Sequence, residues 1–173
     1  MTRANAPTMH RSAELSGCGR YRWLLSRAWD NALPIAVFVM LNPSTADAEQ
    51  DDPTIRRCIG FARRGGCGEI VVINRYTWRA TSPRDLLDAH RRGVDVAGEW
   101  RDSGYLYARL AVAMFGGPFI AAWGAHPLAA EPLPASWPDP PGGWKCLGVT
   151  KSGAPRHPLY VRADEPLVPW VSP

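Results

Sequence analysis

Four short polar segments of this chain each follow an apolar run, and they carry the residue types that could do chemistry. They are 42–47 (NPSTAD), 74–76 (NRY), 124–126 (GAH) and 150–157 (TKSGAPRH). An asparagine side chain offers both a donor and an acceptor, and a histidine can stabilise an anion. The N–H groups of a tight turn can hold a phosphate. The four segments therefore indicate a site for a polar ligand.

The apolar runs that precede these segments are typical of strands. The runs 35–41 (IAVFVML) and 69–73 (EIVVI) are short and unbroken, a pattern typical of strands buried on both faces of a parallel sheet. The runs 119–123 (FIAAW) and 145–149 (KCLGV) predict a third and a weaker fourth strand. The aromatic and apolar run 21–29 predicts an added strand, antiparallel at the sheet edge.

Helices are expected between these strands. The segment 51–53 (DDP) supplies a cap and a first-turn proline, and the apolar residues of 55–62 recur at i, i+3, i+4 and i+7. The glycines at 65–66 end this helix. The pair 82–83 (SP) starts a short helix, and 95–114 supports a longer one.

This alternation predicts a three-layer α/β fold with a mostly parallel four-stranded central sheet, helices on both faces and an added N-terminal strand. The 173-residue length fits one domain. We expect residues 18–173 to form it, and residues 1–17 to be disordered or loosely ordered. Because ligands of open parallel sheets bind beyond the carboxyl ends of the strands, the four polar segments are expected to meet in one cleft.

Each candidate side chain also has a structural interpretation. Asn42 and Asn74 can be turn residues at strand ends, and His126 and His157 can hydrogen-bond within their loops. The sequence alone leaves both interpretations open for each of them.

The charge pattern is compatible with a polyanionic partner. The formal net charge is +4 and the sequence pI is about 9.1. Arginines crowd the first half of the chain and predict either a nucleic-acid-binding surface or solvated helix faces. They are Arg56, Arg57, Arg63, Arg64, Arg75, Arg79, Arg84, Arg91 and Arg92.

Metal, membrane and export signals are not found in the sequence. The four cysteines form no CxxC pair and show no zinc-ligand spacing, so we predict no structural metal and no cofactor. Asp47, Asp51 and Asp52 are expected to cap a helix, with a divalent-metal site as the alternative. The segment 1–16 lacks an apolar region typical of a signal peptide, and no stretch is long enough for a membrane span. A cytoplasmic protein is therefore expected.

The four strand-end segments, taken in order, resemble motifs of the uracil-DNA glycosylase superfamily. The resemblance covers roughly residues 35–160, through 40–44 (MLNPS), Asn74, 123–125 (WGA) and 157–158 (HP). Met40 replaces the first glycine of the family's first motif, and no serine follows 157–158. The stretches LNPSTAD, DDPTIRRC and TKSGAPRHPL resemble an uncharacterised bacterial family, domain of unknown function 1643, more closely still.

The glycosylase resemblance implies hydrolysis of an N-glycosidic bond after a base is flipped out of the stack. Asn42 is then expected to position the attacking water with help from Asp47, and His157 to stabilise the departing base. Asn74 is expected to read the base edge. The other predicted substrate-binding residues are Pro43, Ser44, Tyr76, Trp123, His126, Lys151, Ser152, Gly153 and Arg156.

Three functions are compatible with these residues. The first is a base-excising DNA glycosylase. The second is an enzyme acting on a small nucleotide or nucleoside, and the third is a non-catalytic nucleic-acid-binding module. A basic surface flanking the site favours the first and third, whereas a closed acidic pocket favours the second.

Overall fold

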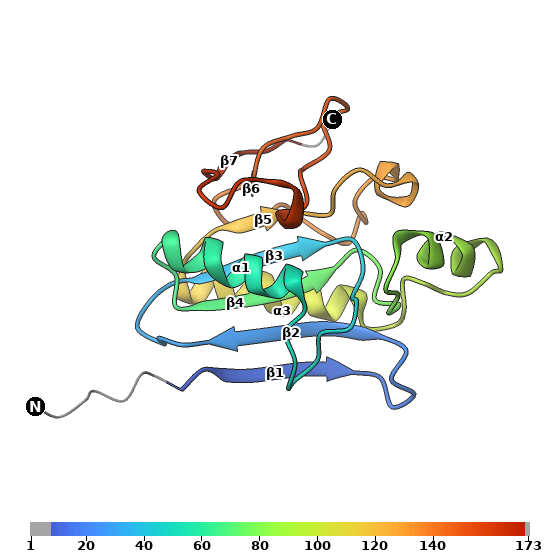
Figure 1. Cartoon of the computed structure of the whole chain (residues 1–173), viewed down its shortest axis with the longest axis horizontal. Helices are drawn as coiled ribbons and strands as arrows, with labels where there is room; N and C mark the ends of the chain where they lie inside the picture. The colour runs from blue at the N-terminus through green and yellow to red at the C-terminus, as the bar shows by residue number, and fades with distance from the viewer. Residues whose placement is uncertain (1–7, 172–173) are drawn as a thin grey trace, which may run out of the picture.

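The computed structural model describes residues 8–171, within which the chain forms seven strands and three α-helices (Figure 1). The strands are β1 (His10–Leu15), β2 (Arg22–Ala28), β3 (Ile35–Met40), β4 (Glu69–Asn74), β5 (Phe119–Ala121), β6 (Trp144–Cys146) and β7 (Val168–Pro169). The helices are α1 (Pro53–Arg64), α2 (Pro83–Arg91) and α3 (Arg101–Phe115). Two 3-10 helices, η1 (Pro127–Ala130) and η2 (Pro158–Tyr160), lie in the loops after β5 and β6.

All seven strands belong to one mixed sheet, in the order β1-β2-β4-β3-β5-β6-β7. The prediction of a mostly parallel four-stranded sheet is therefore wrong. The strands β4, β3, β5 and β6 pair in parallel, but β1, β2 and β7 pair antiparallel and widen the sheet at both edges. Strand β1 lacks an apolar run and β7 has only two residues, so their backbone pairing to an existing strand makes them part of the sheet.

The prediction of a loosely ordered segment over 1–17 is wrong for residues 10–15, which form β1, while residues 1–7 lie outside the described residues. Strand β1 pairs with β2, and the hydroxyls of Ser12 and Ser26 are 2.9 Å apart across the ladder. An irregularity in the register beside Leu15 makes that residue pair with Arg22. A bulge of this kind re-aims the side chains of its strand.

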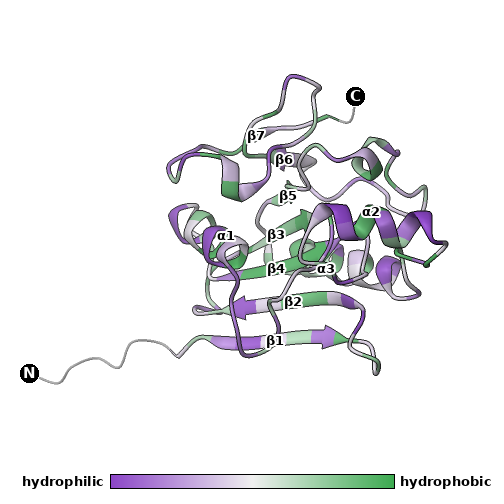
Figure 2. Cartoon of the chain, turned by 45° about the vertical axis from the view of Figure 1, so that its right-hand side comes forward, coloured by the Kyte–Doolittle hydropathy of each residue, from purple (hydrophilic) through white to green (hydrophobic). Residues whose placement is uncertain are grey.

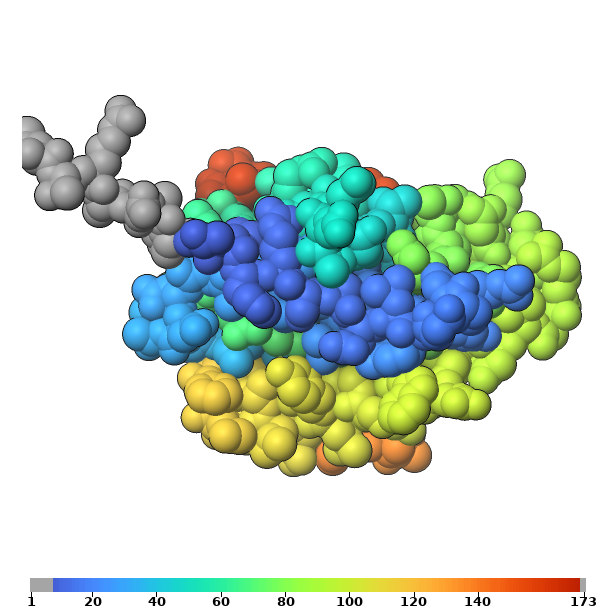
Figure 3. Space-filling model, turned by 90° about the horizontal axis from the view of Figure 1, so that it is seen from below, coloured from blue at the N-terminus to red at the C-terminus, as the bar shows by residue number. Residues whose placement is uncertain are grey.

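The sheet is the middle of three layers. Helix α1 covers one face and α3 covers the other (Figure 1). Seen from the β1 edge, the first strands run between α3 and the segment that leads into α1 (Figure 3). Every residue of β3 is buried, because this strand has neighbours on both sides and helices on both faces. The central strands are accordingly the most hydrophobic part of the ribbon (Figure 2).

The helix starts follow from local capping. Asp52 Oδ1 accepts a hydrogen bond from the Ile55 amide (2.8 Å) at the start of α1, and Ser82 Oγ accepts one from the Asp85 amide at the start of α2. The long helix expected over 95–114 begins only at Arg101. Asp95 closes a turn by accepting the amides of Ala97 and Gly98, which delays the helix.

Residues 8–171 contain no helix that is long and apolar enough to cross a membrane.

Candidate functional site

A cleft of about 740 Å³ opens at the carboxyl ends of the parallel strands. All four polar strand-end segments predicted to converge contribute to its wall. The predicted site residues that line the cleft are Asn42, Ser44, Asn74, Trp123, His126, Arg156 and His157. Arg22, Asp52 and the first turn of α1 complete the opposite wall. The volume lies within the range of about 300–1,000 Å³ that is typical of small-molecule sites.

Asn74 is the most unusual side chain of the cleft. It is the last residue of β4, in parallel register with Met40, and is 2% exposed. Neither the nitrogen nor the oxygen of its amide has a hydrogen-bond partner among the described residues. An unsatisfied buried polar group costs about 1–3 kcal/mol. A ligand that donates to the oxygen and accepts from the nitrogen would remove this cost.

Asn42 lies two residues after the end of β3 and has a different environment. Its amide nitrogen donates to the carbonyl oxygens of Pro43 and Ala80, both at 3.0 Å. The Ala80 amide in turn donates to the Pro43 carbonyl (2.9 Å), which ties the 42–45 loop to the 80–83 wall of the cleft. Both donors of the Asn42 amide are therefore used, so its remaining function toward a ligand or water is that of an acceptor.

Arg22 lies in the wall of the cleft and is 2% exposed. Its Nη1 donates to the Ala46 carbonyl (2.6 Å), whereas its Nε is buried without a partner among the described residues. Burial lowers the pKa of Arg22 to about 10, with the charge of Asp52 opposing the shift. The guanidinium therefore remains a cation at neutral pH.

Asp52 is the carboxylate of the cleft in the described part of the chain. As the N-cap of α1 it uses Oδ1 to accept the Ile55 amide. Its negative charge favours the protonated forms of both Arg22 and His157, although it forms an ion pair with neither. The carboxylate thus lies near both groups while remaining open to a ligand.

His157 precedes η2 and lines the cleft half-buried. Its Nδ1 accepts the Leu159 amide (3.3 Å), so the ring proton of the neutral form is on Nε2. Burial lowers the pKa of His157 to about 4, against the favourable charge of Asp52. Arg57 donates to the carbonyls of Pro158 and Val161 and so attaches this segment to α1. The cleft therefore holds a neutral imidazole whose available group is a donor.

The loop after β5 shapes the floor of the cleft. Gly124 has a φ of +74°, a conformation that favours glycine, and its amide donates to the Pro155 carbonyl (2.9 Å). His126 accepts the Leu128 amide at Nδ1 (3.2 Å), and its Nε2 lies 3.0 Å from the Pro83 carbonyl. Both ring nitrogens of His126 are thus engaged, which fits the structural interpretation of this residue.

Several predicted site residues do not line the cleft in the described structure. Asp47 accepts the amides of Glu49 and Gln50 (both 2.8 Å), and these bonds lower the pKa of its carboxyl. The Tyr76 hydroxyl is hydrogen-bonded to Leu128 and Glu131 inside the core. The others outside the cleft are Pro43, Lys151, Ser152 and Gly153.

The turn 150–154 closes on itself, and only its first residue, Thr150, lines the cleft. The Thr150 amide donates to the Ala154 carbonyl (2.8 Å), and the hydroxyls of Thr150 and Ser152 are 2.9 Å apart. Gly153 supplies the positive φ that the turn needs, and its carbonyl accepts the indole N–H of Trp170. Ser152 and Gly153, whose tight turn could have held a phosphate, therefore do not line the cleft.

The described residues contain no group of three or more His, Cys, Asp or Glu side chains arranged to hold a metal ion. The carboxylates considered for a metal instead accept hydrogen bonds from protein groups: Asp47 from backbone amides, Asp51 from Arg11 and Arg27, and Asp52 from the Ile55 amide.

Sequence reasoning missed Arg22 and the position of Asp52 in the cleft. Asp52 was correctly expected to cap α1, but its neighbours across the cleft come from distant segments. The available signal was a pair of arginines, Arg22 and Arg27, in a largely aromatic and apolar run, which is unusual for a strand that becomes buried, but this signal does not distinguish one arginine from the other.

Comparison with known proteins gives one match, which is to a family model. No curated protein and no solved structure matches the chain, so the resemblance to the uracil-DNA glycosylase superfamily is not shown. The family model described as "Protein of unknown function (DUF1643)" matches residues 22–159, a range that includes every element lining the cleft except the last residue of η2. The chain belongs to this family.

Proposed function

We propose that the cleft binds the base of a small nucleoside or nucleotide and that the protein hydrolyses its N-glycosidic bond. The unpaired amide of Asn74 is the observation that carries this proposal. A carboxamide with a free donor and a free acceptor matches the adjacent acceptor and donor on the edge of a nucleobase. The Trp123 indole, which also lines the cleft, offers an aromatic surface for the base.

A small ligand is favoured over DNA because three of the nine arginines that suggested a nucleic-acid surface, Arg57, Arg75 and Arg79, are used inside the fold. The other six arginines of this set are exposed. Arg57, Arg75 and Arg79 each donate to two or more backbone carbonyls, and Arg63 and Arg64 lie over the rings of Trp29 and Phe61. Arginines whose donors are bound to backbone carbonyls are not free to neutralise a row of phosphates.

The chemistry assigns different tasks to the polar groups of the cleft. The departing base develops negative charge, which a donor fixed before the reaction can stabilise. The Nε2–H of neutral His157 is such a donor. Asp52 is the carboxylate able to take a proton from the attacking water, and Asn42 Oδ1 is an acceptor that can orient that water. In this proposal Asp52 has the role that the sequence suggested for Asp47.

Binding and hydrolysis are tested separately with the full chain. Isothermal titration calorimetry with adenosine, guanosine, cytidine, uridine and their 5′-monophosphates should show saturable binding of at least one base. Asn74→Leu, which keeps the approximate shape but removes both polar atoms, should weaken that binding at least 10-fold. Asn31→Leu, in the exposed β2–β3 turn, is the matched control and should leave it unchanged.

Release of free base is then followed by chromatography under single-turnover conditions. Asp52→Asn keeps a helix-capping side chain and should abolish release while binding persists. Absence of binding to every nucleoside and nucleotide, or full binding by Asn74→Leu, would overturn the proposal. Creation of abasic sites in an oligonucleotide by a protein that ignores free nucleotides would favour DNA as the substrate instead.

A further inference from the structure

Arg22 lines the cleft, and one edge of its guanidinium has no hydrogen-bond partner among the described residues. Nη1 is bound to the Ala46 carbonyl, which fixes the orientation of the planar group. The edge formed by Nε and Nη2 has no hydrogen bond to any described residue, and Nε is fully buried. This is the edge with which an arginine binds two oxygens of a carboxylate or phosphate at once.

The same strand shows what this edge does when it has a partner. Arg27 donates from Nε to the Asp51 carboxylate (2.7 Å) and from Nη2 to the Asp47 carbonyl. Arg22 has no ion pair within 4.0 Å among the described residues. A buried cation without a counter-ion is costly, because its hydration has been removed and, for Arg22, a single carbonyl replaces it.

A second group of positive potential borders the same part of the cleft. Pro53, Thr54 and Ile55 form the first turn of the 12-residue helix α1 and line the wall. The N-terminus of a helix carries a partial positive charge and attracts anions. Arg22 and this helix end therefore face the same volume, and together they fit an oxyanion with at least two oxygens.

Arg22 and Asn74 are placed to contact two different parts of one ligand. In the β2–β4 ladder, Leu25 pairs with Val72, so Arg22 and Asn74 lie at the same end of neighbouring strands. The guanidinium is bound to the loop before α1, whereas the Asn74 amide lies at the end of β4. A ligand with a base at one end and an anion at the other can reach both.

We propose that Arg22 and the N-terminus of α1 bind a phosphate group of the substrate, which makes the substrate a nucleoside monophosphate and not a free nucleoside. This inference rests on the proposed function for the base, but the anion site stands on its own observations. Asp52 is the opposing charge, and we infer that its carboxylate weakens phosphate binding while serving the hydrolytic step.

Calorimetry with the full chain tests the phosphate site by comparing each nucleoside with its 5′-monophosphate. The wild-type protein should bind the nucleotide at least 10-fold more tightly. Arg22→Lys keeps the charge but lacks the two-donor edge, and should reduce this ratio to near one without changing nucleoside affinity. Arg91→Lys, an exposed arginine of α2, should keep the ratio of the wild type. Asp52→Asn should raise nucleotide affinity several-fold and leave nucleoside affinity unchanged.

Inorganic phosphate and a short single-stranded oligonucleotide complete the test. If no nucleoside binds but millimolar phosphate raises the melting temperature of the wild type and not of Arg22→Lys, the anion site is correct and the proposed base site is wrong. If the oligonucleotide binds through Arg22 and the free nucleotide does not, the phosphate belongs to a polymer. A nucleotide preference that survives Arg22→Lys, or equal binding of nucleoside and nucleotide by the wild type, overturns the inference.

Discussion

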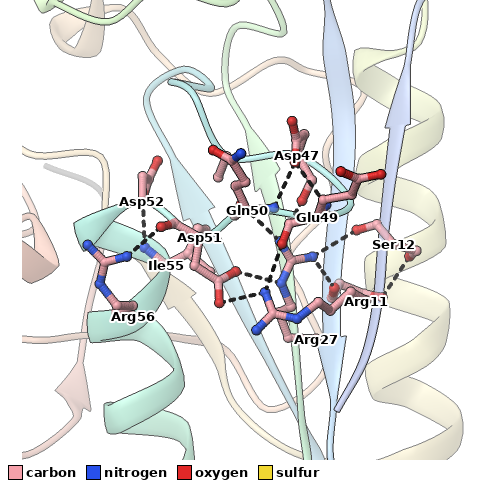
Figure 4. A network of polar contacts seen from close by, with 12 residues as sticks. Arg11, Ser12, Arg27, Asp47, Glu49, Gln50, Asp51, Asp52, Ile55 and Arg56 are labelled. Atoms are coloured by element: carbon pink, nitrogen blue, oxygen red, sulfur yellow. Dashed lines mark hydrogen bonds and ion pairs between the residues drawn. The ribbon is translucent and has the colours of Figure 1, made fainter. Parts of the chain in front are cut away.

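Arg27 and Arg22 lie on the same strand and are almost equally buried, but their side chains differ in how many of their donors have a partner. Arg27 donates from all three nitrogens, to Asp51 and to the carbonyls of Ser12, Ser26 and the 47–50 turn, and forms the centre of a polar network (Figure 4). The side chain of Arg22 has one hydrogen bond in the described structure, and the other edge of its guanidinium has no partner. Burial alone therefore does not distinguish a structural arginine from a binding one.

A structural arginine differs from a binding one in whether its donor groups have hydrogen-bond partners within the protein. A buried cation whose donors all have protein partners fastens segments of the chain together, and Arg27 joins β1, β2 and the loop before α1 in this way (Figure 4). A buried cation whose donors face a cavity lowers stability until a ligand arrives. The comparison predicts that removing the first kind is harmful to folding, and that removing the second kind is harmful only to binding.

The largest effect is expected for Arg27→Met. This change leaves the Asp51 carboxylate and several carbonyls without their buried donor, so the free energy of unfolding should fall by about 3–5 kcal/mol. Arg22→Met, on the same strand, loses one hydrogen bond but also an unpaired charge, and should stay within about 1 kcal/mol of the wild type. Urea denaturation measures both. Equal losses for the two variants would contradict the comparison.

Asn74→Leu should have the next largest effect, in the opposite direction. The change removes two unpaired polar atoms from a buried strand end, so the unliganded protein should gain about 1–3 kcal/mol of stability. Asn42→Leu is the matched comparison. It should lose stability, because the Asn42 amide bridges two loops. A destabilised Asn74→Leu variant would show that the Asn74 amide has a partner in the folded protein.

The pH dependence of stability should reveal the buried imidazole. The pKa of His157 is about 4 in the folded protein, below the ordinary value of 6.5, so between these values the unfolded chain binds a proton that the folded chain does not. Stability is therefore lost as pH falls from 6.5 toward 4. In His157→Gln, the loss between pH 7 and 5.5 should be smaller by about 1 kcal/mol, as measured by urea denaturation at each pH. Parallel pH profiles for the two proteins would contradict this assignment.

The parts of the site that local sequence predicts are those formed by single strands. The unbroken apolar runs at 35–41 and 69–73 indicated the buried parallel pair, and their ends placed Asn42 and Asn74 at one edge. The sequence could not indicate that the first amide has internal partners and the second has none. That difference arises because the 80–83 wall reaches Asn42 from far along the chain.

Arg22 shows why the rest was missed. Its Nη1 binds the Ala46 carbonyl, which is 24 residues away along the chain, so this placement depends on the fold and not on the local sequence. The arginines at 57, 75 and 79 were misleading for the same reason, since their carbonyl partners lie in loops distant in sequence. The charge of the sequence therefore indicated how many cations the fold holds, but not which of them are bound within the fold and which is buried without a full set of partners.

The smallest effect is expected at the outer end of the Arg27 network. Arg11 also binds the Asp51 carboxylate, at 2.8 Å, but its side chain is 36% exposed, whereas that of Arg27 is 0% exposed. Exposed ion pairs contribute about 0–1 kcal/mol, because water solvates both charges in the unfolded chain and one of them in the folded one. Arg11→Ala should therefore lower stability by less than about 1 kcal/mol, and 1 M NaCl should reduce even that difference. Arg11 and Arg27 bind the same carboxylate. If Arg11→Ala lowered the free energy of unfolding as much as Arg27→Met, the exposed ion pair would contribute as much to stability as the buried one, which would contradict the comparison.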